Sequence, residues 1–392
     1  MGNKRSVLKR HRFAAIVVAV PIVLVCSLFI ARTLRLQSID RQIAAIEAAR
    51  AIPDSENAAV LYREFFQDFA VASMSFQRML IQRAKGHRLG KAWRSSDYPE
   101  LATLISKNQE AISRLIEITK MEKCCFPIPR TIEELEGPTS PRIDATKWTS
   151  VLRYAMGNDI GEGRIEAAIE KYASIVGLAR HLCEQPISLY YIIGMGIESW
   201  PSEAISRLVV EGDISDAQLD LLRNALLPPT DGWPSLQQMT EEVDALSEAR
   251  RIQQIGFTDW IKYCSFRTNV QYIHGKEQDA TPPSFHPEHV SQQVLTIRRG
   301  LYILVELRRY RNRRGRWPEN LEAIRALLTD EILTDPRNGG PFFYEVTSDG
   351  FRLMSLGANK LDDRGHRREC DDSSLWPTWR MMDELKKEEN AK

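Results

Sequence analysis

The stretch Phe13 to Ala31, FAAIVVAVPIVLVCSLFIA, contains no charged residue. A helix of about 19 residues is roughly 28 Å long, which is close to the thickness of the hydrocarbon core of a bilayer. We therefore predict a transmembrane helix at 13–31. Basic residues crowd the short segment before it and are sparse after it, so the positive-inside rule predicts that residues 1–12 are cytoplasmic and that the rest lies outside. The preceding basic residues are Lys4, Arg5, Lys9, Arg10 and Arg12.

A cleaved signal peptide is the alternative, because it also has a basic head and an apolar core. The end of the run, Ser27 to Ala31, lacks the alternating small residues of a cleavage site. Bulky Val25 before Cys26 disfavours lipid attachment at that cysteine. We therefore expect an uncleaved anchor, with cleavage near Ala31 as the alternative. Pro21 is compatible with a membrane helix, where neighbouring groups satisfy the freed carbonyl.

The composition indicates that the rest of the chain is water-soluble and that its positive and negative charges are balanced. The 392 residues have a mean hydropathy of -0.33, and 53 Lys and Arg oppose 52 Asp and Glu. This balance argues against a general nucleic-acid partner. About 360 residues follow the apolar run, enough for two modest domains or one elongated domain.

The cysteines are too few and too irregularly spaced for a disulfide framework or a paired zinc motif. One of them lies in the apolar run, and an odd number remains outside it, so a bridge would leave at least one thiol free in a monomer. They are Cys26, Cys124, Cys125, Cys183, Cys264 and Cys370.

Residues 32–266 are predicted to form an almost wholly α-helical extracytoplasmic domain, because apolar residues recur at spacings of three and four. Ile52-Pro53-Asp54 should end the first helix, and Asp54 or Ser55 should cap the second. Asp97 should cap a helix that runs to about Lys123, and Ser215 to Gln218 reads as a capping box. The proline-rich segment Cys124 to Arg142 should be a linker that packs on the domain through Phe126 and Ile128.

A different pattern follows the polar linker 267–287. A long helix is predicted from about Glu288 to Arg311, followed by strands at Phe342–Val346 and Phe351–Leu356 that Ser348-Asp349-Gly350 joins as a hairpin. The hairpin should pack on the helix at Leu301 to Leu307, because a two-stranded sheet is marginal alone. We expect Phe342 with Tyr344, and Phe351 with Leu353, as two pairs on different faces. The expected class is mainly α, with a helical hairpin or repeat-like bundle, a small α+β module at 288–376 and a charged tail at 377–392.

The middle of the chain resembles the tetratricopeptide helical repeat. The run Gly163-x-x-x-Ala167-Ala168-x-x-x-Tyr172 is similar to the junction between paired helices in that family. The match covers about one repeat, and a regular 34-residue period is not visible. An irregular helical bundle is the alternative.

The C-terminal region resembles the major pseudopilin of bacterial type II secretion over about 288–376. The matching words are Gly315-x-Trp317-Pro318, Leu333-x-Asp335-Pro336, Gly340-Pro341 and Met354-Ser355-Leu356-Gly357-Ala358-Asn359. The whole arrangement also resembles a family of uncharacterised bacterial membrane-anchored proteins. This resemblance implies a bacterial inner membrane. The pseudopilin cleavage word before the apolar segment is missing, so assembly into a pilus by that mechanism is not expected.

The pseudopilin resemblance also implies a calcium site, because that family binds the ion in the loop after the Ser-Leu-Gly word. The matching aspartates here are Asp362, Asp363, Asp371 and Asp372. Asn359 stands where the family often has aspartate, and nearby arginines oppose a cation. A solvated charged loop is therefore the alternative.

Catalytic motifs are not found: the sequence lacks a GxSxG elbow, a phosphate-binding GxxxxGK[ST] loop and an HExxH helix. His286-Pro287-Glu288-His289 has no further potential ligands at the spacing of a metal site. Cys124 and Cys125 are more typical of buried packing residues than of reactive thiols. One local basic patch is interpreted as a solvated helix face, with an anionic partner as the alternative. Its members are Arg298, Arg299, Arg308, Arg309, Arg311, Arg313, Arg314 and Arg316.

Two function classes follow. The first is a non-enzymatic inner-membrane protein whose lipid contact is 13–31 and whose soluble part binds other envelope proteins. The second is an envelope hydrolase whose site is not visible as a motif. An accessory role in a secretion or pilus-like apparatus is a further alternative.

Overall fold

The protein is mainly helical and ends in a small antiparallel sheet, which confirms the coarse fold prediction. The computed structural model describes residues 3–70, 91–130, 134, 135, 137, 140–229, 287–362, 372–378 and 381, with backbone alone at 3–22, 24, 188 and 287–289. Several sequence predictions lie outside these residues. They are residues 230–266 of the predicted helical domain, the linker at 267–286 and most of the C-terminal tail.

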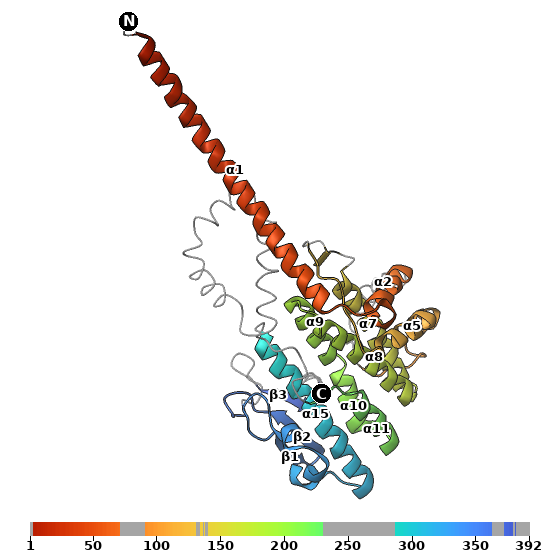
Figure 1. Ribbon diagram of the computed structural model, residues 1–392. Coiled ribbons are helices and arrows are strands. Elements are labelled where there is room, and N and C mark those ends of the chain that lie inside the picture. The colour runs from red at the N-terminus through yellow and green to blue at the C-terminus, as the bar shows by residue number, and fades with distance from the viewer. Residues whose placement is uncertain are drawn as a thin grey trace, which may run out of the picture. The chain divides into compact units, whose positions relative to one another are not determined.

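The chain forms two compact units, residues 1–51, 127–137 and 240–282 in one and residues 52–126, 138–239 and 283–392 in the other. The described part of the first unit is dominated by α1 (Asn3–Ala49), a single long helix (Figure 1). Near its end, Ile39 and Ile43 are buried, and the Glu47 carboxylate accepts hydrogen bonds from the backbone N–H of Ile128 and from Arg130. The buried side chain of Ile128 agrees with its predicted packing.

Farther toward the N-terminus, α1 exposes large apolar side chains. Val23, Phe29 and Ile30 are 63%, 59% and 57% exposed. Within the described residues, no helix combines the length and the apolarity needed to cross a membrane. The transmembrane helix predicted at 13–31 is therefore not supported by the fold, and the side chains of its residues 13–22 lie outside those described.

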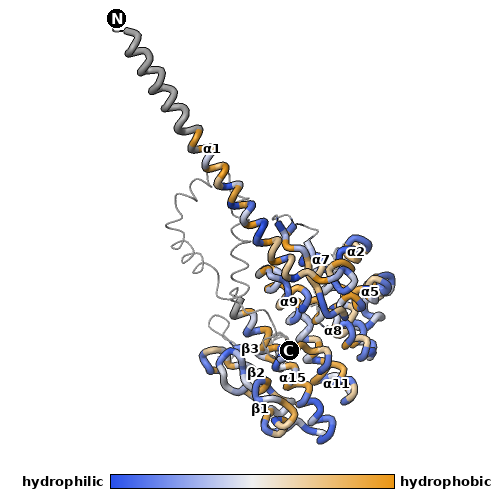
Figure 2. The backbone as a smooth tube through the Cα atoms, in the orientation of Figure 1, coloured by the Kyte–Doolittle hydropathy of each residue, from blue (hydrophilic) through white to orange (hydrophobic). Residues whose placement is uncertain are grey.

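The second unit contains the remaining described elements, and Figure 1 shows α7, α8 and α9 packed side by side. Figure 2 shows apolar and polar residues alternating along these helices, as expected for elements with one buried face. The elements are η1 (Asp54–Glu56), α2 (Ala58–Asp68), α4 (Pro99–Lys107), α5 (Gln109–Thr119), α7 (Pro141–Gly161), α8 (Ile165–Cys183), α9 (Ser188–Ser199), α10 (Ser202–Glu211), α11 (Asp216–Ala225), α15 (Pro287–Arg314), η3 (Leu321–Leu327), α16 (Asp330–Leu333), β1 (Phe343–Thr347), β2 (Gly350–Ser355) and β3 (Ser373–Trp376).

Of the predicted helix caps, that of α11 is confirmed and those of α2 and α4 are wrong. Ser215 and Gln218 form the predicted reciprocal capping box of α11. The cap of α2 is Asn57, whose side chain accepts from the Ala59 N–H, and not Asp54 or Ser55, which belong to η1. Asp97 does not cap α4, since its carboxylate accepts from the Arg94 N–H. Pro99 begins that helix, where its missing N–H removes no intrahelical bond.

Two segments that the apolar periodicity predicts as single helices are each divided into two helices in the structure. Asn108 separates α4 from α5, and its side-chain amide donates to the Leu104 carbonyl at 2.7 Å, which competes with a backbone helical bond. The sequence also predicts one helix from Ile187 to Val210, and Pro201 divides it into α9 and α10 because proline has no backbone N–H to donate.

The sheet has the order β1-β2-β3 with both pairs antiparallel. The hairpin is confirmed, and β3 was not predicted. Tyr344 pairs with Leu353 and Val346 pairs with Phe351, and directly paired residues share a face. Phe351 and Leu353 share a face, as predicted, but the expectation that they lie apart from Phe342 and Tyr344 was wrong, because all four join one core cluster.

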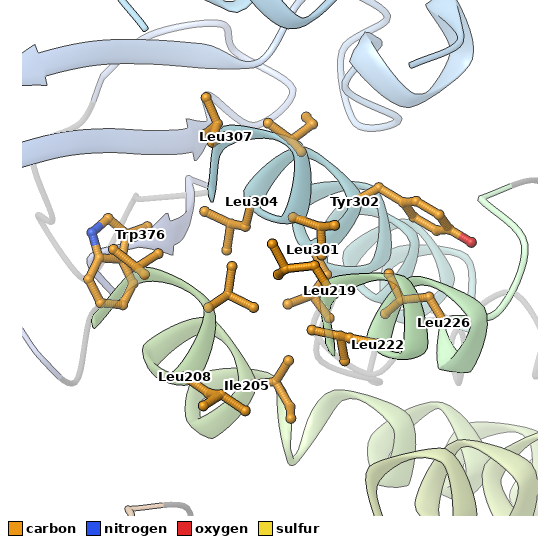
Figure 3. Close-up of a cluster of buried hydrophobic side chains, with 14 of the residues drawn as sticks. Ile205, Leu208, Leu219, Leu222, Leu226, Leu301, Tyr302, Leu304, Leu307 and Trp376 are labelled. Carbon is orange, nitrogen blue, oxygen red and sulfur yellow. The ribbon is translucent and has the colours of Figure 1, made fainter. Parts of the chain in front are cut away.

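The helical middle and the C-terminal region share that core. Helix α15 contacts α9, α10 and α11 as well as β2 and β3 (Figure 1). Figure 3 shows Leu208 of α10, Leu222 of α11, Leu304 of α15 and Trp376 of β3 as members of one buried cluster. The region at 288–376 thus does not have a core of its own, although the sequence set it apart.

Candidate functional site

A pocket of about 810 Å³ lies between α4, the start of α5, α7, α8 and the segment before α4. We call that segment, residues 91–98, the strap. The pocket is lined by Ser95, Ala102, Thr103, Ile105, Ser106, Lys107, Gln109, Ala155, Asn158, Asp159, Arg164, Ala167 and Lys171. The strap and α4 supply one wall, and α7 and α8 supply the other.

Two glycines of α7 let the strap lie directly against that helix. A Cβ atom at Gly161 would lie 2.1 Å from the carbonyl oxygen of Trp93, and one at Gly157 would lie 2.8 Å from that of Lys91. The Trp93 backbone N–H donates to the Gly157 carbonyl, and its indole Nε1 donates to the Tyr154 carbonyl at 3.0 Å. Buried Trp93 thereby fixes the strap on the helix.

The end of the strap is tied to the α7–α8 turn. The Ser95 backbone N–H donates to the Glu162 carboxylate at 2.7 Å, and this hydrogen bond lowers the pKa of Glu162. The Asn158 amide donates to the Ser95 hydroxyl at 3.1 Å. Gly163 provides the turn with a positive φ of 75°, which glycine adopts without the strain of a Cβ atom.

At the base of the pocket, two cations share the carboxylate of Asp159. Lys171 Nζ lies 2.6 Å from Oδ2, and Arg164 Nε lies 2.8 Å from Oδ1. Asp159 and Lys171 are each 6% exposed, so each charge needs the other to offset its lost hydration. Arg164 also donates to the Asn158 amide oxygen at 2.8 Å. The four residues form a rigid hydrogen-bonded group, which we call the Asp159 cluster.

The lining has more positive than negative charge. Lys107, Arg164 and Lys171 are cationic, whereas Asp159 is the one anionic side chain among the lining residues. These residues include no histidine and no cysteine, and hydroxyl and amide groups supply the other polar atoms. The arrangement suits binding of a polar or anionic group better than bond making, since it pairs no nucleophile with a base.

The predicted calcium ligands are only partly described. Asp362 accepts a hydrogen bond from Arg352 at 3.2 Å, and Asp372 is buried beside β3. Asp363 and Asp371 lie outside the described residues. No group of three or more metal-binding side chains occurs in the described part of the chain. The calcium site therefore stays a prediction.

The predicted basic patch mostly holds the second unit together and is not simply a solvated helix face. Arg308 donates to the Val209 and Val210 carbonyls at the end of α10, and Arg313 pairs with Asp216 of α11. Arg298 makes a buried two-point ion pair with Glu198 of α9, at 2.8 and 2.9 Å. These bonds connect α15 to three preceding helices.

The other polar residues singled out by sequence do not gather into a site. His286 lies outside the described residues, and Glu288 and His289 are described by their backbone alone. Cys124 and Cys183 are buried, and the described cysteines form no disulfide.

One buried polar network was not predicted. His181 Nδ1 lies 2.9 Å from the Tyr62 hydroxyl, and its Nε2 lies 2.8 Å from the Met121 carbonyl oxygen. Because a carbonyl only accepts, we assign the imidazole hydrogen to Nε2, and Tyr62 donates to Nδ1. Burial lowers the pKa of His181 to about 4. This neutral histidine connects α2, the end of α5 and α8 and has no role at the pocket.

Sequence reasoning missed the Asp159 cluster. Asp159, Arg164 and Lys171 match no motif, because the α7–α8 turn brings them together. A weak sequence sign was available: Lys171 immediately precedes buried Tyr172, at a helix position that neighbouring apolar residues surround. Comparison with known proteins adds no further assignment, since no protein-family model, curated protein or solved structure matches the chain.

Proposed function

We propose that the chain is a non-enzymatic, membrane-anchored binding protein whose second unit docks other envelope proteins at the pocket between the strap, α4, α7 and α8. The observation that carries this proposal is the Asp159 cluster. Its charged side chains are fixed by one another, so the pocket presents ordered donors, and its one carboxylate is held by two cations and is not paired with a hydroxyl.

Membrane anchoring is proposed from the uncharged stretch 13–31 and the basic residues before it. Exposed Val23, Phe29 and Ile30 on α1 support it, because a helix surface of this kind needs an apolar surrounding. The proposed location is the bacterial inner membrane with the N-terminus in the cytoplasm. Resistance to carbonate extraction, and inactivity of a cytoplasm-dependent reporter fused after Lys392, are the expected results.

For the C-terminal region, we propose a pseudopilin-like module that helps to present the binding unit. The loop of the Asp335-Pro336 word supports this, since buried Asp335 accepts from the Arg337 N–H at 3.0 Å and from the Asn338 amide at 2.8 Å. Asn338 also donates to the Gly357 carbonyl in the Ser-Leu-Gly word. The sequence words of the resemblance therefore contact one another. We also propose that the helical middle of the chain is tetratricopeptide-like, on the basis of the sequence from Gly163 to Tyr172.

The binding function is tested by photo-crosslinking in native membranes. A photoreactive amino acid at exposed Thr103, on the pocket wall, should capture a specific protein, and the same group at exposed Glu319 should not. Equal products from both positions would contradict docking at the pocket. Hydrolytic turnover that disappears in Asp159→Asn would contradict the non-enzymatic assignment.

A further inference from the structure

We infer that the pocket recognises carboxylate groups, so that its ligand is an acidic segment of a partner protein. This inference rests on the proposed binding function and adds the chemistry of the ligand. It follows from the uneven charge of the lining, the donors that Arg164 leaves available and the size of the pocket.

Arg164 is the main donor offered to a ligand. Its side chain is 50% exposed, and it donates through Nε to the Asp159 carboxylate and through Nη2 to the Asn158 amide oxygen. A guanidinium has five N–H groups, so others remain without a protein acceptor among the described residues. A carboxylate can accept two parallel hydrogen bonds from a guanidinium that is held in one orientation.

The Asp159 cluster explains why an added anion is tolerated. Lys171 and Arg164 together carry two positive charges against the single charge of Asp159, and Lys107 on α4 adds a third cation at the wall. A carboxylate entering beside Arg164 therefore meets a net positive lining even though Asp159 is present. Because Asp159 lies deep and is paired twice, its repulsion of the ligand is largely offset.

The site favours a peptide over a nucleic acid or a lipid surface. The pocket is open to solvent and its volume is about 810 Å³, which leaves room for more than one acidic side chain. The chain as a whole is nearly neutral, and Arg309 and Arg313 of α15 are engaged by Asp216, Asp220 and Glu306. An extended polyanion would therefore find little additional positive surface there.

The test measures binding of fluorescein-labelled hexaglutamate and hexaglutamine to the full chain in detergent. Hexaglutamate should bind, and hexaglutamine should bind at least tenfold more weakly. Arg164→Gln and Lys107→Gln should each weaken hexaglutamate binding about tenfold, the effect of losing 1.4 kcal/mol. Arg325→Gln is the matched control, because it removes one exposed charge from η3, outside the pocket, and should leave binding unchanged.

Equal binding of the two peptides, or equal weakening by Arg325→Gln, would overturn the inference. Displacement of hexaglutamate by inorganic phosphate at lower concentration than by free glutamate would overturn the assignment to carboxylates. Exposed Lys107 keeps the test decisive if Arg164→Gln alters the fold. A partner captured from Thr103 despite failed hexaglutamate binding would leave the docking function standing and remove only the ligand chemistry.

Discussion

Asp159 is the residue on which the pocket depends most. We expect Asp159→Asn to destabilise the protein by about 3 kcal/mol, because it leaves the buried Lys171 ammonium without a counter-ion. Arg164→Gln should cost less than about 1 kcal/mol, since that side chain is half-exposed. Urea unfolding of the three proteins at pH 7 measures both changes. Similar costs for the two variants would show that burial of Lys171 is not the cause.

His181 should make stability depend on pH. Its folded pKa of about 4 lies below the unfolded value near 6.5, so the unfolded state binds more protons between these values. The histidine's contribution to the free energy of unfolding is thus fully present above about pH 6.5 and is lost as pH falls toward 4. The expected loss is about 3 kcal/mol.

The control for this pH dependence is His181→Gln, which removes the titrating ring and keeps a side chain that can bond to Tyr62 or to the Met121 carbonyl. Urea unfolding between pH 7 and 4.5 should show a steeper decline in the unmodified protein than in the variant. The same decline in both would assign the effect to carboxylates elsewhere.

At the residue scale, the sequence predicted positions whose role follows from neighbours along the chain. Ser215 was found because its capping partner is three residues away. Asp159 and Lys171 were not found, because a buried ion pair across two helices leaves no fixed spacing in sequence. The arginines of α15 were read as solvent-facing, since charge alone does not reveal that Arg308 meets the carbonyls at the end of α10.

Among the elements, the strap offers the sharpest test. Gly161→Ala should detach it, because the added Cβ would fall 2.1 Å from a backbone oxygen that has no rotamer to change. Gly163→Ala is the control: its surroundings are open, so the expected cost is the strain of a positive φ, about 1 to 2 kcal/mol, with the strap in place. Faster amide exchange at residues 91–98 in Gly161→Ala alone is the expected result, and unchanged protection would contradict the close packing.

The hairpin gives a second prediction at this scale. Phe351 is 2% exposed and its ring contacts Trp317, Tyr344 and Trp376, so Phe351→Ala should cost about 3 to 5 kcal/mol. Val346, its cross-strand partner, is 46% exposed, and Val346→Ala should cost less than about 1 kcal/mol. Thermal or urea unfolding of the full chain separates the two. Comparable losses would place the hairpin's buried face elsewhere.

Most helices and the hairpin were predictable from periodicity, because each repeats its apolar pattern over many residues or carries a turn residue such as Gly350. The third strand was not, since β3 has four residues and its pairing with β2 is interrupted by an irregularity at Leu353 and Met354. The breaks at Asn108 and Pro201 were missed for a related reason: apolar spacing continues across them.

For the whole molecule, the sequence did not predict that the helical middle and the C-terminal region share one core. A polar, proline-rich segment before α15 indicated a boundary between domains. Yet Leu301, Ile303, Leu304 and Leu307 are all 4% exposed or less, so α15 is apolar on more than the side that faces the sheet. Sequence periodicity shows how broad an apolar face is, but not which elements cover each part of it.

This shared core predicts that the second unit unfolds cooperatively. Leu219→Ala in α11 and Phe351→Ala in β2 each open a cavity in the same cluster. Within each variant, α8 and the sheet should therefore lose the same amount of stability. The buried Glu198–Arg298 pair adds a link between α9 and α15.

Amide hydrogen exchange of the full chain in moderate urea measures this for residues 165–183 and 350–355 separately. Leu327→Ala, at a position that is 43% exposed on η3, is the control and should change neither. If Leu219→Ala speeds exchange in α8 but leaves β2 protected, the sheet and α15 unfold apart from the helices. The pocket wall made by α7 and α8 would then be stable without the C-terminal region, whereas cooperative loss means that the pocket requires it.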